Sequence, residues 1–120
     1  MIYRRKMYNV APSILDDFNE HFNKTLLPTQ LKYGARLVGR WMTKENNGVI
    51  EIFAIWEYDS FEDYEIIENK VKSDEEHVKR VQNWYKKMGG REKLKEVFFK
   101  IEQDFLETTV PFDKTILSKK

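Results

Sequence analysis

The feature that most restricts the fold of this chain is an Asn47-Gly48 pair between two runs of strand-forming residues. A type I′ turn needs positive φ at both central positions, and Asn followed by Gly tolerates this best. Residues 35–43 and 49–58 are therefore predicted to be adjacent antiparallel strands joined by a two-residue turn.

A strand and a helix precede this hairpin. Residues 2–10 mix β-branched and aromatic side chains at strand length, and Pro12 ends them. The Ser13-Ile14-Leu15-Asp16 sequence has the form of a helix-capping box. The helix that follows repeats apolar residues every four positions, and Pro28 is expected to kink it or end its regular part. Its apolar positions are Ile14, Phe18, Phe22 and Leu26.

Two helices and a last strand follow the hairpin. Ser60 and the Ser73-Asp74 pair are expected to cap these helices, and Gly89-Gly90 ends the second one. A short helical turn over 91–96 then leads to a strand over 100–110. The order βαββαβ predicts an α+β domain of the ferredoxin-like kind, a four-stranded antiparallel sheet with its helices on one face.

Length and composition exclude several classes of protein. The 120 residues suit one domain, which we place at residues 1–110, with a loosely held tail over 111–120. The 21 basic and 20 acidic residues give a net charge of +1, so no overall field attracts nucleic acid or an anionic membrane. No stretch approaches the roughly 18 apolar residues of a membrane span. With no cysteine and no secretory signal, the expected location is the cytoplasm.

The third predicted strand indicates a homodimer. It is apolar on both faces over residues 49–56, which is typical of a strand buried on both sides. The helices cover only one face of such a sheet, so a second copy of the chain is expected to cover the other. The expected pairs on the helix-covered face are Trp41 with Ala54, Gly39 with Trp56 and Leu37 with Tyr58. The other face is expected to carry Arg36, Val38, Arg40, Met42, Glu51, Phe53, Ile55 and Glu57, a mixture typical of a subunit interface.

Five segments carry a resemblance to a known family: Tyr3-Arg4-Arg5-Lys6, Phe18-Asn19-Glu20-His21-Phe22, Gly34-Ala35-Arg36-Leu37-Val38-Gly39, Ile52-Phe53-Ala54-Ile55-Trp56-Glu57-Tyr58 and Phe61-Glu62-Asp63-Tyr64. In register and order the chain resembles the NIPSNAP family over about residues 1–110. The resemblance implies a dimeric α/β barrel and, with no targeting segment, a bacterial cytoplasmic protein. Bacterial members mostly have no assigned function, and the wider group of dimeric barrels includes cofactor-independent monooxygenases and haem-degrading enzymes.

Arg36, Arg40 and Glu57 are the strongest candidates for a binding site, because charged side chains on a covered strand face need partners or a ligand. They form either an ion pair across the dimer or a clamp for a carboxylate-bearing small molecule. Trp41 belongs to a set of aromatic residues that either fill the core or line a pocket for a small apolar ligand.

The two histidines are weaker candidates. His21 is a candidate catalytic residue, although a helix residue paired with Asp17 is the simpler interpretation. His77 lies among acidic residues that helix capping already explains. With two histidines and no cysteine, we expect no metal site and no cofactor.

Two functional hypotheses follow from these observations. The first is a NIPSNAP-like homodimeric domain that acts as a small-molecule-binding or interaction module. The second is a cofactor-independent monooxygenase- or isomerase-like enzyme with a pocket between sheet and helices. RNA-binding RRM domains share the βαββαβ order, but the third strand lacks their base-stacking pattern, so no nucleic acid partner is expected.

Overall fold

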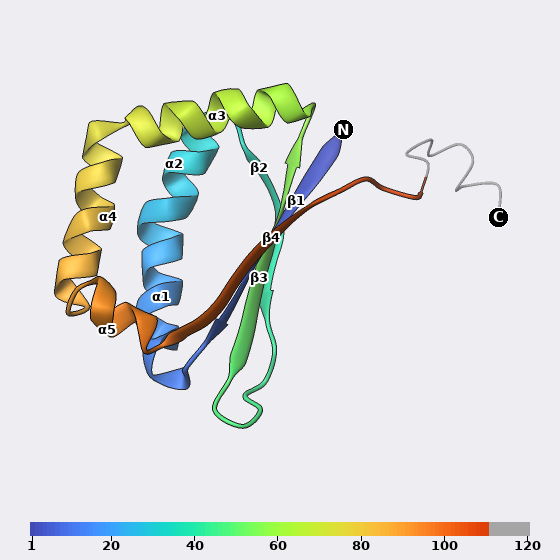
Figure 1. Ribbon diagram of the computed structural model, residues 1–120. Coiled ribbons are helices and arrows are strands. Elements are labelled where there is room, and N and C mark those ends of the chain that lie inside the picture. Colours follow the sequence, from blue (N-terminus) through green and yellow to red (C-terminus); the bar gives the residue numbers. More distant parts are fainter. Residues whose placement is uncertain (111–120) are drawn as a thin grey trace.

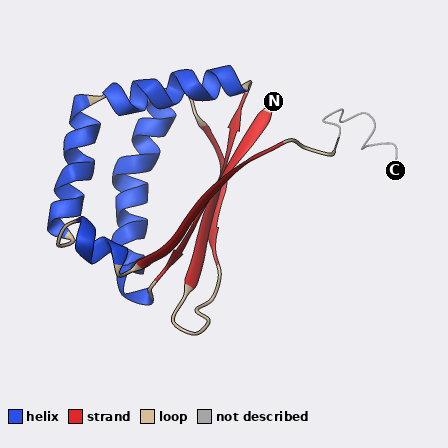
Figure 2. Cartoon of the chain, in the orientation of Figure 1, coloured by secondary structure: helices blue, strands red, loops and turns tan. Residues whose placement is uncertain are grey.

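The computed structural model describes residues 1–110 and confirms the predicted βαββαβ order. Four antiparallel strands form one sheet in the order β2-β3-β1-β4, and the helices lie on only one of its faces (Figures 1 and 2). The expected tail over 111–120 lies outside the described residues. The elements are β1 (Ile2–Val10), η1 (Pro12–Ile14), α1 (Leu15–His21), η2 (Phe22–Leu26), α2 (Leu27–Lys32), β2 (Arg36–Met42), β3 (Ile50–Tyr58), α3 (Phe61–Ser73), α4 (Glu75–Lys87), α5 (Arg91–Lys95) and β4 (Phe98–Leu106).

The first helical segment departs from its prediction at its start. Among the described residues Ser13 caps no helix: it lies in the 3₁₀ turn η1, and α1 begins at Leu15 without a side-chain cap from this part of the chain. Pro12 at the first position of η1 favours this start, because its fixed φ suits a helical turn and it has no N–H to satisfy. The predicted irregularity near Pro28 is confirmed. The π-helical turn η2 precedes it, with the Leu27 N–H bonded to the carbonyl of Phe22.

The later helices begin at capping residues, as predicted. The Ser60 hydroxyl accepts a hydrogen bond from the Asp63 N–H at 3.1 Å, and the Asp74 carboxylate accepts one from the His77 N–H at the same distance. The last strand is shifted from the predicted 100–110, because β4 runs antiparallel to β1 and ends where β1 begins, with Leu106 opposite Tyr3. No helix within residues 1–110 is both long and apolar enough to cross a membrane.

The turn of the central hairpin is confirmed, but its predicted register is wrong. Asn47 and Gly48 have positive φ (52° and 79°), and the residues on either side of them form a β-bridge. Beyond this bridge the first arm carries one extra residue, so Trp41 lies opposite Phe53. A second extra residue, Val38, exchanges the faces once more, so the residues before it lie on the faces that were predicted for them. Each extra residue exchanges the faces of the strand, so Trp41 and Arg40 lie on the faces opposite to those predicted, whereas Leu37 and Arg36 lie as predicted.

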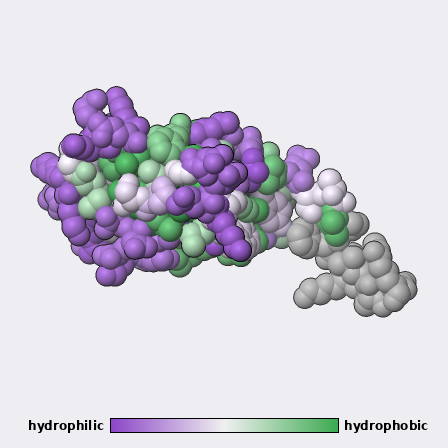
Figure 3. All heavy atoms as spheres, turned by 90° about the horizontal axis from the view of Figure 1, so that it is seen from below, coloured by the Kyte–Doolittle hydropathy of each residue, from purple (hydrophilic) through white to green (hydrophobic). Residues whose placement is uncertain are grey.

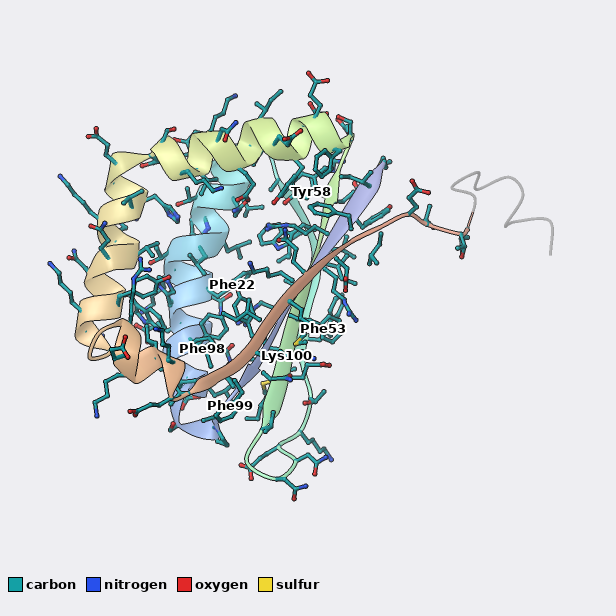
Figure 4. The ribbon with its side chains drawn as sticks, viewed as in Figure 1. Phe22, Phe53, Tyr58, Phe98, Phe99 and Lys100 are labelled. Atoms are coloured by element: carbon teal, nitrogen blue, oxygen red, sulfur yellow. The ribbon has the colours of Figure 1, made fainter. Side chains whose placement is uncertain are left out.

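Alternation along β3 divides the sheet into two faces. Ile50, Ile52, Ala54, Trp56 and Tyr58 are all buried beneath the helices. The residues between them are half-buried on the opposite side, which we call the open face. Figure 4 shows Phe22 between the helices and the sheet, with Phe53 on the other side of the sheet. The core therefore lies between the sheet and its one helical layer.

Candidate functional site

Two cavities lie between the sheet and the helices. The first, which we call the cationic cavity, has a volume of about 200 Å³. Its polar lining comprises Arg4, Lys6, Gln30, Arg40, Glu68 and His77. The second, which we call the aromatic cavity, has a volume of about 400 Å³ and is bordered by β4, α1, α4 and α5. Tyr8 and Leu26 line both cavities, so the two are neighbours.

Arg4 is held at the cationic cavity by strand alternation. It lies opposite Trp56 in the sheet, which directs its side chain beneath the helices, where it is only 7% exposed. One terminal nitrogen lies 3.7 Å from the Glu68 carboxylate, and the guanidinium is 5.2 Å from the centre of the Tyr64 ring. Its Nε is buried and has no hydrogen-bond partner among the described residues. Arg4 is thus a buried cation with part of its donor capacity unused.

Arg40 reaches the same cavity from β2 because of the shift in hairpin register. Its Nη1 donates a 2.7 Å hydrogen bond to the Asn19 side chain, and its guanidinium lies 4.3 Å from the centre of the Phe22 ring. Its Nη2 is buried and unpartnered among the described residues. Burial lowers the pKa of Arg40. No carboxylate within residues 1–110 lies within 4 Å of this half-buried guanidinium to offset its charge.

Lys6 and His77 complete the basic lining. Lys6 lies two residues after Arg4 on the same face of β1, and burial, followed by the charge of Arg4, lowers its pKa. Burial also lowers the pKa of His77, whose Nδ1 is buried without a partner among the described residues. Gln30 donates a 3.1 Å hydrogen bond to Glu68 and leaves its own side-chain oxygen unpartnered there.

These groups give the cationic cavity an excess of positive charge. Arg4, Lys6 and Arg40 line it, against one carboxylate, Glu68. Buried cations are costly unless an opposite charge or hydrogen-bond acceptors satisfy them. A small anion with planar oxygen acceptors would satisfy the unused guanidinium donors. Among residues 1–110 no group of three or more His, Cys, Asp or Glu side chains is placed to hold a metal ion.

The aromatic cavity is mainly apolar. Tyr8, Phe18 and Phe98 meet edge to face, with ring centres 4.9 Å apart for Tyr8 and Phe18 and 6.0 Å apart for Tyr8 and Phe98. The cavity lies at the end of the molecule where α5 and the start of β4 meet. Figure 3 views the molecule from below and shows hydrophobic residues at the surface among hydrophilic ones. The cavity therefore suits the apolar part of a ligand.

His21 also lines the aromatic cavity. Its ring stacks on Trp84 at 4.2 Å, with 6° between the planes, and it is 6% exposed. Burial, and to a smaller extent the nearby His77, lower the pKa of His21 to about 4, so the ring is neutral at pH 7. The expected ion pair with Asp17 is absent, since no ion pair of His21 occurs within residues 1–110.

The structure separates the predicted binding residues. Arg36 and Glu57 lie on the open face, where the Arg36 Nε contacts a Glu57 oxygen at 2.7 Å and its Nη2 contacts Asp59 at 2.9 Å. The hydroxyl of Tyr3 donates to Glu57 at 3.2 Å. Arg40 lies beneath the helices, so it forms no clamp with Arg36 and Glu57. The grouping of Arg40 with these two residues is therefore wrong, and the extra residue in the hairpin is its cause.

Trp41 also lies on the open face rather than beneath the helices. It is 47% exposed and packs against Phe53, with ring centres 5.5 Å apart. Its indole covers Gly39, where an added Cβ would lie 2.4 Å from the ring. Trp41 therefore belongs to the open face and not to either cavity between sheet and helices.

Sequence reasoning missed most of the cationic cavity. Arg4, Lys6 and Tyr8 occupy every second position of β1 and so share the face beneath the helices. Two positive charges on the inner face of a central strand were the signal that could have revealed the cavity. Glu68 and His77 gave no such signal, because a carboxylate on α3 and a histidine beside a helix cap are both explained by local structure.

Comparison with known proteins finds one matching family and several similar structures. A match to the NIPSNAP family covers residues 3–96, well over half of the chain. No curated protein sequence matches the chain. The structure is similar to that of a NIPSNAP family protein with unknown function from Agrobacterium tumefaciens, with a TM-score of 0.66, 17% identity and 92% of each chain covered.

Two further structures extend this likeness. An uncharacterized NIPSNAP domain protein from Burkholderia xenovorans has a TM-score of 0.66 and 17% identity, over 92% of this chain and 99% of that one. A putative antibiotic biosynthesis monooxygenase from Bacillus cereus has a TM-score of 0.53 and 12% identity, over 92% and 94% of the two chains. At these identities the similarity shows a shared fold only. Through the match over residues 3–96, the chain belongs to the NIPSNAP family.

Proposed function

We propose that this protein is a cytoplasmic, homodimeric small-molecule-binding module that holds a small organic carboxylate in its cationic cavity. The observation that carries this proposal is the excess of positive charge at this cavity, from buried Arg4 and half-buried Lys6 and Arg40, with nitrogens on Arg4 and Arg40 that have no partner among the described residues. A carboxylate accepts two parallel hydrogen bonds from one guanidinium, and such charge-assisted bonds are stronger than neutral ones.

Isothermal titration calorimetry with a panel of small carboxylates tests the binding proposal. Arg40→Gln should weaken binding about 10-fold or more, because a hydrogen bond to a charged group contributes about 1.5–3 kcal/mol. Arg36→Gln is the matched control, since Arg36 lies on the same strand but on the open face, and it should leave the affinity within about twofold. If no carboxylate binds the wild type, or if both variants bind equally well, the proposal is wrong.

The open face supports the homodimer. Met7, Phe53, Ile55 and Trp41 give it an apolar centre, with Phe53 opposite Met7 on one side and Trp41 on the other. Ion pairs flank this centre, including Arg5 with Asp104 at 3.0 Å. An apolar centre inside a charged rim is typical of subunit interfaces. A second copy of the sheet offers the same apolar centre, so the two faces are self-complementary under twofold symmetry.

Native mass spectrometry of the untagged protein tests the dimer. The wild type should give the mass of two chains. Phe53→Glu should give single chains, because it places a charge at the centre of the open face, whereas Ile66→Glu should leave the dimer intact. Ile66 is 44% exposed on α3, away from that face, and so is a matched exposed apolar position. A monomeric wild type would overturn this part of the proposal.

A second candidate function is a cofactor-independent monooxygenase- or isomerase-like enzyme. The observation that favours it is the neutral ring of His21 at the aromatic cavity, where it is able to accept a proton. Oxygen uptake with a panel of phenolic substrates, abolished by His21→Gln, would support a monooxygenase. No uptake with the wild type would leave this candidate without support.

A further inference from the structure

The cationic and aromatic cavities meet at shared side chains. Tyr8 and Leu26 line both of them, and the Lys6 ammonium group lies 5.8 Å from the centre of the Tyr8 ring. Tyr8 therefore presents one side to the basic lining and another to the aromatic lining. An occupant of one cavity lies next to the other.

The helix beside the cavities makes the same connection. Phe18 lines the aromatic cavity and Phe22, one turn later, lines the cationic cavity. The Arg40 guanidinium lies over both rings, 5.2 Å from the centre of Phe18 and 4.3 Å from that of Phe22. Its Nη2, which has no partner among residues 1–110, is thus a donor at the border between the two cavities.

The two linings differ in chemistry. Basic side chains dominate the smaller cavity, whereas aromatic and aliphatic side chains dominate the larger one. One small inorganic anion would satisfy the first cavity and leave the second without an occupant. Ligand sites in proteins commonly combine a mainly apolar wall with a few polar groups that fix orientation. The two cavities together have this character.

We propose that the ligand is an aryl-substituted carboxylic acid that spans both cavities. Its carboxylate lies among Arg4, Lys6 and Arg40, and its ring lies among the aromatic side chains beside Tyr8. This inference rests on the proposed carboxylate-binding function and adds the class of ligand. In this arrangement the aromatic cavity selects ligands that carry an aryl ring.

Three probes separate this inference from simple anion binding. They are acetate, 3-phenylpropionate and 3-phenylpropionamide, each titrated calorimetrically into the wild-type protein. The acid with the ring should bind at least 10-fold more tightly than acetate, through the aromatic cavity, and at least 10-fold more tightly than the amide, through the basic lining. If acetate binds as tightly as 3-phenylpropionate, the two-cavity inference is wrong and carboxylate binding stands. If neither acid binds, the proposed function itself fails.

A filling variant provides the second measurement. Ile101→Trp adds bulk at the rim of the aromatic cavity on β4, at a residue that is 55% exposed and outside the buried core. It should weaken 3-phenylpropionate about 10-fold and leave acetate unchanged. Phe99→Trp is the control on the same strand, because Phe99 is 52% exposed and does not line the cavity. Equal affinity of wild type and Ile101→Trp for 3-phenylpropionate would overturn the inference.

Discussion

Stability below neutral pH should depend on His21. Its pKa falls from 6.5 to about 4 on folding, chiefly because burial disfavours the charged ring. Between these two pH values the unfolded chain binds more protons than the folded one. The free energy of unfolding therefore decreases as the pH falls from 6.5 towards 4, and this contribution is constant above and below that window.

The magnitude follows from the two pKa values. A difference of 2.5 between them corresponds to about 3.4 kcal/mol of stability lost by the time the pH is well below 4. At pH 5 the loss is about 2 kcal/mol relative to pH 7.5. The other charged groups around His21 are Asp17, Glu20, Lys24, His77, Arg80, Lys87, Arg91 and Lys95.

Urea unfolding of wild type and His21→Gln at pH 7.5 and pH 5 measures this effect, with the same protein concentration throughout. Removing the ring also removes its stacking on Trp84, but that loss is the same at both pH values. The change in stability between the two pH values should therefore be about 2 kcal/mol smaller in the variant than in the wild type. Titration of the surrounding carboxylates is common to both proteins and cancels.

His77→Gln serves as the comparison, because His77 is the other histidine with a pKa lowered by burial. In this variant His21 should still contribute about 2 kcal/mol to the loss of unfolding free energy between pH 7.5 and pH 5. If His21→Gln and wild type lose the same stability between pH 7.5 and pH 5, His21 is not the buried neutral base that this reasoning requires.

Three further changes test the fold. Ile52→Ala, at a residue 1% exposed, should lower the free energy of unfolding in guanidinium by about 2–5 kcal/mol, and a loss under about 1 kcal/mol would contradict its place in the core. Ser60→Ala removes the cap on the Asp63 N–H and should cost about 1 kcal/mol by thermal unfolding; an unchanged midpoint would show that this cap is unimportant. Gly48→Ala should cost about 1–2 kcal/mol, because φ is 79° and no atom of the described residues lies within 4 Å to add a clash, so unaltered stability would argue against the turn conformation.

Local signals predicted the fold well. The Asn47-Gly48 turn and the Ser60 cap each depend on residues close together in sequence, and the structure confirms both. The order of the elements then limits the sheet to few topologies, because connections between neighbouring elements are short and follow regular rules. For this reason the βαββαβ plan and the family were recoverable before any coordinates.

The candidate site depended on the register of the hairpin, which the sequence pattern did not predict. One extra residue in the hairpin moved Arg40 beneath the helices and Trp41 to the open face. Whether the chain accommodates such a residue depends on packing of β2 against its neighbours, and a shift of one position exchanges the two faces of a strand. The predicted group of Arg36, Arg40 and Glu57 failed for this reason.

The cationic cavity combines residues from both halves of the chain. Arg4 lies on β1, Glu68 on α3 and His77 on α4, and only the packing of the helices over the sheet brings them together. In the amino-acid sequence, turns, caps and periodic apolar residues established the class of fold, because these are local preferences of the backbone. The tertiary structure alone decided which charges are buried, because burial is set by contacts between elements distant along the chain.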